Sequence, residues 1–136
     1  MSNNIKDKKV VRSDKAPKAL GPYSVGIMAG HFVFASGQAG IDPVTNNLVE
    51  GGIEAETRQV LTNLRNVLEA AGTSLDKVVK TSVFLRDMND FSKMNAIYGE
   101  FFKIDPPART TVQVAALPKG AAVEIEVIAL QNGDEE

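Results

Sequence analysis

The sequence predicts an α/β fold, in which two helices pack on one face of a mixed β-sheet. The chain has 136 residues, the size of one domain. Two segments carry apolar residues at the three-to-four-residue spacing of amphipathic helices. Shorter apolar segments precede, separate and follow them, so the predicted order is β-β-α-β-α-β-β. We expect residues 1–136 to form one domain, with flexible tails at 1–9 and 132–136.

Two short strands begin the predicted fold. Ser24–Ala29 and Phe32–Ser36 flank Gly30-His31, a pair typical of a tight hairpin turn. A further strand at Val10–Arg12 fits the same pattern. The sequence from 37 to 52 is rich in Gly, Pro, Asn and Asp, which predicts a loop.

The clearest predicted element is a helix over Glu54–Ala71. Its apolar stripe comprises Val60, Leu61, Leu64, Val67, Leu68 and Ala71. The next segment, Val78–Leu85, alternates as a strand does. This alternation predicts Val79, Val83 and Leu85 on one face of the sheet.

A second helix is predicted over Asp90–Lys103, and Pro106-Pro107 prevents its continuation. Arg109–Val114 and Ala122–Leu130 follow as strands, joined by a turn around residues 118–120, and we expect them to pair antiparallel. Because each helix has one apolar stripe, both can cover the same sheet face. No helix remains to cover the opposite face, so we expect oligomerisation through it.

The composition limits the possible chemistry. A net charge of −2 gives no electrostatic reason to expect a nucleic-acid or anionic-membrane partner. The absence of cysteine excludes disulfides and thiolate catalysis, and a single histidine, His31, argues against a zinc site. Residues 1–9 lack the apolar core of a secretory signal, and no apolar run reaches about 20 residues. We therefore expect a soluble cytoplasmic protein.

Arg109 is the first candidate functional residue. It follows Pro106-Pro107-Ala108, so the start of its strand is rigid. Its planar guanidinium suits bidentate binding of a carboxylate. The alternative is a structural ion pair at the end of a strand, and spacing alone favours that alternative.

Two glutamates and a tyrosine are further candidates. Glu124 and Glu126 share one strand face, where they are either a solvated polar surface or functional, as a general base or as a partner that orients Arg109. Tyr23 lies in a Gly-Pro turn that could present its phenol at a cleft, or it is a packing residue. Ser36-Gly37 ends a strand where a ligand could approach the backbone, or it is simple turn chemistry.

At these residues the chain resembles the RidA family, also called YjgF, of reactive-intermediate deaminases. The resemblance covers about residues 10–130 and rests on an ordered set of stretches. These are Gly21-Pro22-Tyr23-Ser24, Phe34-Ala35-Ser36-Gly37-Gln38, Asn63-Leu64 to Gly72, Lys80 to Leu85, Asn95-Ala96-Ile97-Tyr98, Pro107-Ala108-Arg109-Thr110-Thr111, Leu117 to Gly120 and Glu124-Ile125-Glu126. One stretch alone would be a weak signal, whereas the ordered set is specific.

The resemblance implies a chorismate-mutase-like fold and a homotrimer with three clefts between subunits. It implies hydrolysis of 2-aminoacrylate and related 2-imino acids, such as 2-iminopropanoate and 2-iminobutanoate, to 2-keto acids and ammonia. It implies no metal and no organic cofactor. The alternatives are a non-catalytic keto-acid sensor, a chaperone-like trimer or, ranked lower for this composition, an endoribonuclease or translation inhibitor.

The resemblance also assigns roles to individual residues. It places the carboxylate-binding arginine at Arg109, a water-positioning glutamate at Glu124 and a cleft tyrosine at Tyr23. The matching substrate-binding positions are Ser36, Gly37, Phe91, Asn95 and Thr111. Many family members have cysteine where this chain has Thr111, so any role that requires a thiol is absent here.

Overall fold

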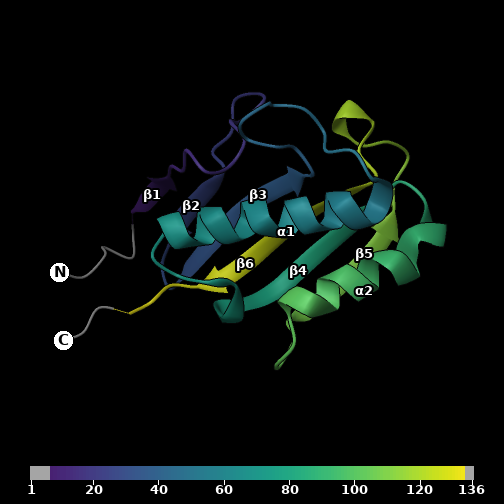
Figure 1. Cartoon of the computed structure of the whole chain (residues 1–136). Helices are drawn as coiled ribbons and strands as arrows, with labels where there is room; N and C mark the ends of the chain where they lie inside the picture. Colours follow the sequence, from purple (N-terminus) through teal and green to yellow (C-terminus); the bar gives the residue numbers. More distant parts are fainter. Residues whose placement is uncertain (1–6, 134–136) are drawn as a thin grey trace.

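Six strands form one sheet in the order β1-β2-β3-β6-β4-β5 in the computed structural model, which describes residues 7–133 (Figure 1). The strands are β1 (Lys8–Val11), β2 (Gly26–Ala29), β3 (Phe32–Ala39), β4 (Val78–Leu85), β5 (Ala108–Gln113) and β6 (Val123–Leu130). The helices are α1 (Gly52–Ala70) and α2 (Phe91–Phe101), with short 3₁₀ turns at Leu75–Lys77, Met88–Asp90 and Pro118–Gly120. The predicted α/β domain with a mixed sheet and two helices is confirmed.

The pairing of the last two strands differs from the prediction. β5 does not pair with β6: it pairs in parallel with β4, and β6 lies between β3 and β4, antiparallel to both. A parallel pair needs a long crossover, which α2 supplies between β4 and β5. β6 takes the central place because its inward side chains Val123, Ile125 and Val127 are fully buried under the helices, which an edge position would not provide.

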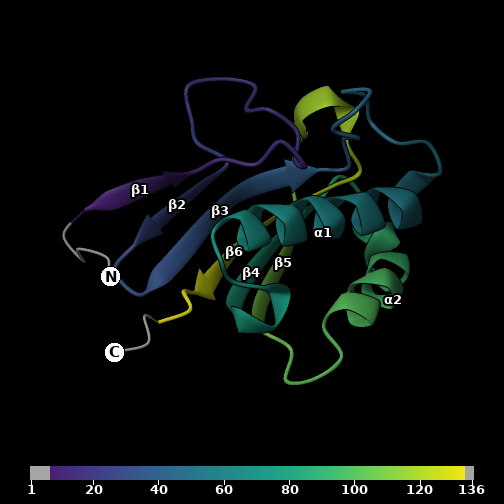
Figure 2. The same cartoon turned by 60° about the vertical axis from the view of Figure 1, so that its left-hand side comes forward.

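Both helices cover the same face of the sheet, as the apolar stripes predict (Figures 1 and 2). α1 packs on the central strands β3 and β6, and α2 lies beside it toward the β4–β5 edge. Val60, Leu61, Leu64 and Val67 of α1 have no exposed surface. α1 begins at Gly52 rather than Glu54, and Gly51 and Gly52 adopt positive φ angles where the preceding loop enters the helix.

One local expectation, the face of Val79, is corrected by the backbone. Val79, predicted to point inward with Val83, is 39% exposed because the β4–β6 register shifts between Val78 and Lys80. A bulge of this kind turns one residue out of the alternation, and Thr81 resumes the inward row with no exposed surface.

Parts of both segments expected as flexible tails belong to the fold. Lys8 and Lys9 belong to β1 and pair with β2, which satisfies backbone groups along the edge of that strand. Asn132 donates a hydrogen bond to the backbone of the turn after α1. The rest of the two expected tails, residues 1–6 and 134–136, lies outside the described residues.

The sheet face opposite the helices, which we call the open face, has no covering element among residues 7–133 (Figure 2). Val33 and Ala35 of β3 are buried, so the alternating Phe32 and Phe34 lie on the open face, 38% and 43% exposed. Leu130, opposite Phe32 on β6, is also exposed. Two exposed phenylalanines and a leucine give this uncovered face an apolar character.

Candidate functional site

A cavity of about 350 Å³ lies where β3 and β6 meet the loop before β2, and we call it the glutamate pocket. The residues that line it are Pro17, Lys18, Leu20, Tyr23, Val25, Ser36, Gly37, Gln38, Ala39, Ile41, Pro118, Glu124 and Glu126. Of the predicted site residues, it therefore brings together Tyr23, Ser36, Gly37 and Glu124. Glu126, weighed beside Glu124 from their spacing, lines the same cavity.

A β-bulge shapes the floor of the glutamate pocket. The β3–β6 register shifts between Ala35 and Gln38, so Ser36 and Gly37 form the irregular step. The Ser36 hydroxyl donates a 2.6 Å hydrogen bond to the carbonyl of Ser24, which fixes the step against the chain before β2. The resulting geometry leaves the backbone of Gly37 facing the cavity.

The carboxylate of Glu124 occupies the space above Gly37. A Cβ atom at position 37 would collide with Oε2 and Cδ of Glu124. Burial raises the pKa of Glu124, and the like charge of Glu126 raises it further. A half-buried carboxylate with a raised pKa is a stronger base than an exposed one, which suits it to accept a proton from water.

Tyr23 lies at the exposed rim of the glutamate pocket. Its hydroxyl oxygen accepts a 3.1 Å hydrogen bond from the backbone N–H of Leu20, and its own N–H donates to the carbonyl of Gly21. The turn is thus closed on itself and holds the ring in place. Because the oxygen accepts from Leu20, the phenolic proton can be donated to a ligand.

A second group, the arginine cluster, forms between α2 and β5. It comprises Phe91, Asn95, Tyr98, Arg109 and Thr111. Phe91, Asn95 and Tyr98 follow one another at helical spacing on one side of α2. Arg109 and Thr111 alternate with exposed residues on β5, so they share one strand face.

The Arg109 guanidinium rests on aromatic rings. Its Cζ atom lies 4.8 Å from the centre of the Tyr98 ring and 5.5 Å from that of Phe91. Within residues 7–133 no carboxylate lies within ion-pair distance of Arg109. The structural ion pair that spacing alone favoured is therefore wrong for the described part of the chain.

Two polar atoms of the arginine cluster are buried without a hydrogen-bond partner in the described structure. They are Oδ1 of Asn95 and Oγ1 of Thr111. A buried polar atom without a partner costs about 1–3 kcal/mol, so such atoms mark places where a bound group can form the missing bond. The Arg109 guanidinium suits an anionic group, whereas the Asn95 oxygen suits an N–H donor of a ligand and the Thr111 hydroxyl suits either.

The glutamate pocket and the arginine cluster do not meet within one chain. Glu124 pairs with Phe84 of β4, whereas Arg109 pairs with Thr81, three residues earlier on the other side of β4. Glu124 also alternates with the buried row of β6, which places it on the open face, while Arg109 packs against α2 on the helical face. One small ligand cannot contact both groups of the same chain.

The sequence analysis did not place Tyr98 among the site residues. Tyr98 is 6% exposed and belongs to the core, yet its ring also supports Arg109. The spacing of Phe91, Asn95 and Tyr98 is the signal that groups them on one helix face. His31, predicted at the surface of the hairpin turn, is exposed.

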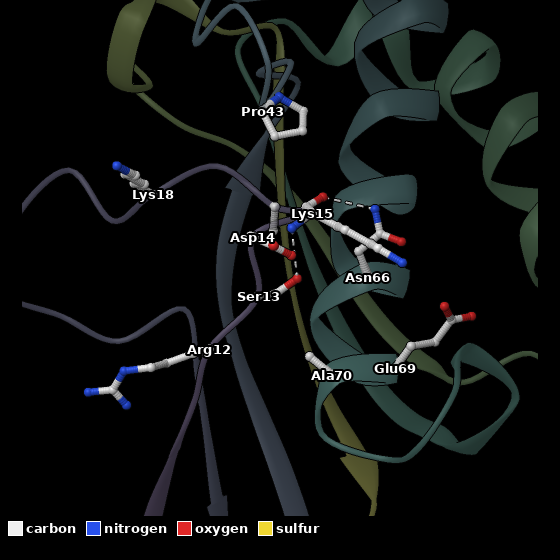
Figure 3. A pocket seen from close by; sticks show the side chains of 10 residues that line it. Arg12, Ser13, Asp14, Lys15, Lys18, Pro43, Asn66, Glu69 and Ala70 are labelled. Atoms are coloured by element: carbon white, nitrogen blue, oxygen red, sulfur yellow. Dashed lines mark hydrogen bonds between the residues drawn. The ribbon is translucent and has the colours of Figure 1, made fainter.

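A wider depression of about 850 Å³ lies between α1 and the segment after β1 (Figure 3). Arg12 and Lys18 point away from Asn66, whereas the side chain of Lys15 runs toward it. Asn66 Nδ2 donates 2.9 Å to the carbonyl of Lys15, a contact that ties the segment to α1. The positive groups do not converge on one point, so this depression is a weaker candidate site.

Residues 7–133 show neither a metal-ligand cluster nor a membrane-spanning helix. Across the described residues, no group of three His, Asp or Glu side chains is arranged to hold a metal ion. No helix between residues 7 and 133 has the length and apolar character to cross a membrane.

The family model described as Endoribonuclease L-PSP matches residues 13–131. A RutC family protein of Pyrococcus horikoshii is 52% identical over 92% of this chain and 99% of its own length. A human protein named 2-iminobutanoate/2-iminopropanoate deaminase is 47% identical over 92% of this chain and 91% of its own length. The crystal structure of Escherichia coli TdcF with bound serine superposes with a TM-score of 0.87 at 38% identity, covering 91% of this chain and 99% of that one.

Proposed function

Because the chain belongs to the Endoribonuclease L-PSP family, also known as RidA/YjgF, we propose that it hydrolyses 2-imino acids to 2-keto acids and ammonia. The substrates are 2-aminoacrylate with its imine tautomer 2-iminopropanoate, and 2-iminobutanoate. Mammalian relatives 47–49% identical to this chain carry the name of that activity.

The observation that carries the proposal is the environment of the Arg109 side chain. Its guanidinium is supported by two aromatic rings and lacks a carboxylate partner among residues 7–133. A planar group with five donors in a fixed fork recognises a carboxylate by two parallel hydrogen bonds. A 2-imino acid has a carboxylate next to its reacting carbon, so binding at Arg109 would place that carbon.

We place the reaction in a cleft between two subunits of a homotrimer. The arginine cluster of one subunit would face the glutamate pocket of its neighbour, because the two groups lie on opposite sheet faces of each chain. The open face with Phe32 and Phe34 supports association, since burial of exposed aromatic surface favours it.

In the proposed mechanism, Arg109 holds the carboxylate and the enamine tautomerises to the imine, which makes C2 electrophilic. Glu124 takes a proton from water while the water oxygen bonds to C2 of the protonated imine, giving a neutral carbinolamine. Glu124 then returns this proton to the nitrogen. The C–N bond breaks and releases ammonia as the C2–O bond becomes the carbonyl, and the hydroxyl proton passes to Glu124 and on to solvent. Tyr23 donates its phenolic proton in a hydrogen bond to the nitrogen or the water. A positioned acid–base group of this kind contributes about 10²–10⁴-fold.

Binding without turnover is the second candidate function. The same carboxylate contact would also hold a 2-keto acid, so a keto-acid sensor or a chaperone-like trimer would use the same residues. The endoribonuclease named in the family description ranks lower, because the chain has one histidine and a net charge of −2.

The test generates 2-aminoacrylate in situ with a serine dehydratase and follows its loss with and without this protein. The Arg109→Ala variant is assayed beside the wild type. Faster loss with the wild type and not with the variant supports hydrolysis and the role of Arg109 together. No acceleration by folded wild-type protein would leave the sensor as the function.

A further inference from the structure

We propose that Tyr98 is a positioning residue for Arg109: anchored to Thr81, its ring holds the guanidinium in the orientation that receives the substrate carboxylate. The inference deepens the proposed function and rests on the carboxylate-binding role given to Arg109 there. Tyr98 itself would not contact the substrate.

Tyr98 is fixed by its surroundings. Its hydroxyl and Oγ1 of Thr81 are 2.8 Å apart in a buried hydrogen bond, and Thr81 has no exposed surface. The Tyr98 ring also packs against Phe102, with ring centres 4.7 Å apart. Burial raises the pKa of Tyr98, which keeps the hydroxyl neutral and able to bond to Thr81. The ring therefore has little freedom to rotate or withdraw.

Thr81, Tyr98 and Arg109 form a closed unit. Arg109 is the register partner of Thr81 in the parallel β4–β5 ladder, so the backbone fixes the base of the arginine side chain relative to Thr81. The hydroxyl contact fixes Tyr98 to the same threonine. The guanidinium carbon lies 4.8 Å from the centre of the Tyr98 ring. Thr81 therefore fixes the backbone end of Arg109 through the strand ladder and the guanidinium end through Tyr98.

The two rings that contact Arg109 are not equivalent. Phe91 is 37% exposed and lies 5.5 Å from the guanidinium carbon, whereas Tyr98 is 6% exposed and lies closer. An arginine on one exposed ring keeps many rotamers, and a buried, anchored ring removes most of them. We therefore assign the positioning role to Tyr98 and not to Phe91.

The chain offers a matched control in a second arginine–aromatic pair, whose aromatic residue lies on α2 as Tyr98 does. Arg65 of α1 lies 5.8 Å from the ring centre of Phe101 at the end of α2. Phe101 is part-buried against the same core, but its arginine belongs to neither the glutamate pocket nor the arginine cluster. Phe101→Leu therefore removes an arginine–aromatic contact and core packing without touching Arg109.

The experiment compares full-length wild type, Tyr98→Leu, Tyr98→Phe and Phe101→Leu. KM and kcat are measured with 2-aminoacrylate generated in situ, and the Arg109 side-chain Nε–Hε resonance is assigned by NMR. In Tyr98→Leu we expect KM to rise about tenfold with a smaller change in kcat, and the Arg109 resonance to lose its ring-current shift. Tyr98→Phe keeps the ring and loses the anchor, so its KM should lie between those of Tyr98→Leu and wild type.

The proposal is overturned if folded Tyr98→Leu keeps the wild-type KM and Arg109 resonance, or if Phe101→Leu raises KM as much. If Tyr98→Leu does not fold, the double variant Tyr98→Phe/Thr81→Val tests the anchoring of the ring instead. It removes both partners of the buried hydrogen bond together, so neither is left unpaired. Failure of the proposed function can be distinguished from failure of the positioning role. Wild type that hydrolyses no imine yet shows an Arg109 resonance sensitive to Tyr98 keeps the positioning role and removes the reaction.

Discussion

Gly37 and Glu124 lie against each other across the β3–β6 ladder, and the carboxylate of Glu124 fills the space that a side chain at position 37 would take. Gly37 is not at a positive φ angle, so its backbone conformation is open to any residue. The requirement for glycine at this position therefore comes from the carboxylate and not from the turn.

Gly37→Ala is predicted to displace Glu124 while the fold is kept. The added methyl group would force the carboxylate out of its position, so kcat for imine hydrolysis should fall by about tenfold or more. The measurement is turnover beside thermal unfolding. Gly99→Ala, where an added Cβ meets no atom within 4 Å, is the control and should leave turnover unchanged. Normal turnover by Gly37→Ala would contradict the placement of Glu124 in the reaction.

Arg109→Lys is predicted to fold normally and to lose most activity. An ammonium cannot reproduce the two parallel hydrogen bonds of the guanidinium fork. Loss of one hydrogen bond to a charged group costs about 1.5–3 kcal/mol, so kcat/KM should fall roughly 10- to 150-fold. Steady-state kinetics checks this expectation, and near-normal kcat/KM in a folded variant would argue against the carboxylate clamp.

Glu126→Gln is predicted to shift the pH profile toward acid. Burial is the larger cause of the raised pKa of Glu124, and the charge of Glu126 is the second. Removing that charge lowers the Glu124 pKa, so the ionised base persists to lower pH and the acidic limb of kcat/KM moves down. Glu50→Gln, an exposed acid in the loop before α1, should leave the limb in place. If the acidic limb of kcat/KM does not move in Glu126→Gln, the charge of Glu126 does not influence the titration of Glu124.

Glu56 of α1 is predicted to control stability rather than turnover. It is 5% exposed and accepts a 2.8 Å hydrogen bond from the N–H of Ala122, just before β6. Burial raises its pKa, against the opposing effects of the Ala122 bond and of Arg86. Folding therefore favours the protonated form, a contribution present below the ordinary pKa of 4.5 and lost as pH rises through the folded-state pKa.

Two variants test this account of Glu56. Glu56→Gln keeps an acceptor for the Ala122 N–H without a buried charge, so at pH 7 it should be as stable as wild type or more stable. Glu56→Ala leaves that N–H unpaired and should cost about 1–3 kcal/mol of unfolding free energy. Urea unfolding at pH 7 and pH 5 measures both, and a Gln variant as unstable as the Ala variant would contradict the account.

Much of the fold follows from periodicity. The stripe of Val60, Leu64 and Val67 and the alternation of β6 determine which side of each element is buried, and burial is what folding selects. The β5–β6 pairing was wrong because alternation specifies a strand's inward face and not its neighbour. The predicted face of Val79 was wrong because one inserted residue reverses the alternation of β4. The residues next to Val79 in the sequence do not mark this bulge.

The candidate site, like the fold, could be predicted only in part from the sequence. Residue types and resemblance point to Arg109, Glu124 and Tyr23, but their separation depends on strand order. The central place of β6 puts β4 between Glu124 and Arg109, and alternation puts the two side chains on opposite faces. That the two groups lie apart within one chain therefore emerges only once the sheet is assembled.

Complementation between inactive variants tests the shared cleft most directly. Arg109→Ala and Glu124→Gln proteins are mixed in equal amounts, unfolded together, refolded and assayed for imine hydrolysis. The account predicts about a quarter of the wild-type rate, because three quarters of random trimers contain both variants and each of these has one complete cleft in three. If the mixture remains as inactive as either variant alone after verified subunit exchange, the cleft between subunits is contradicted.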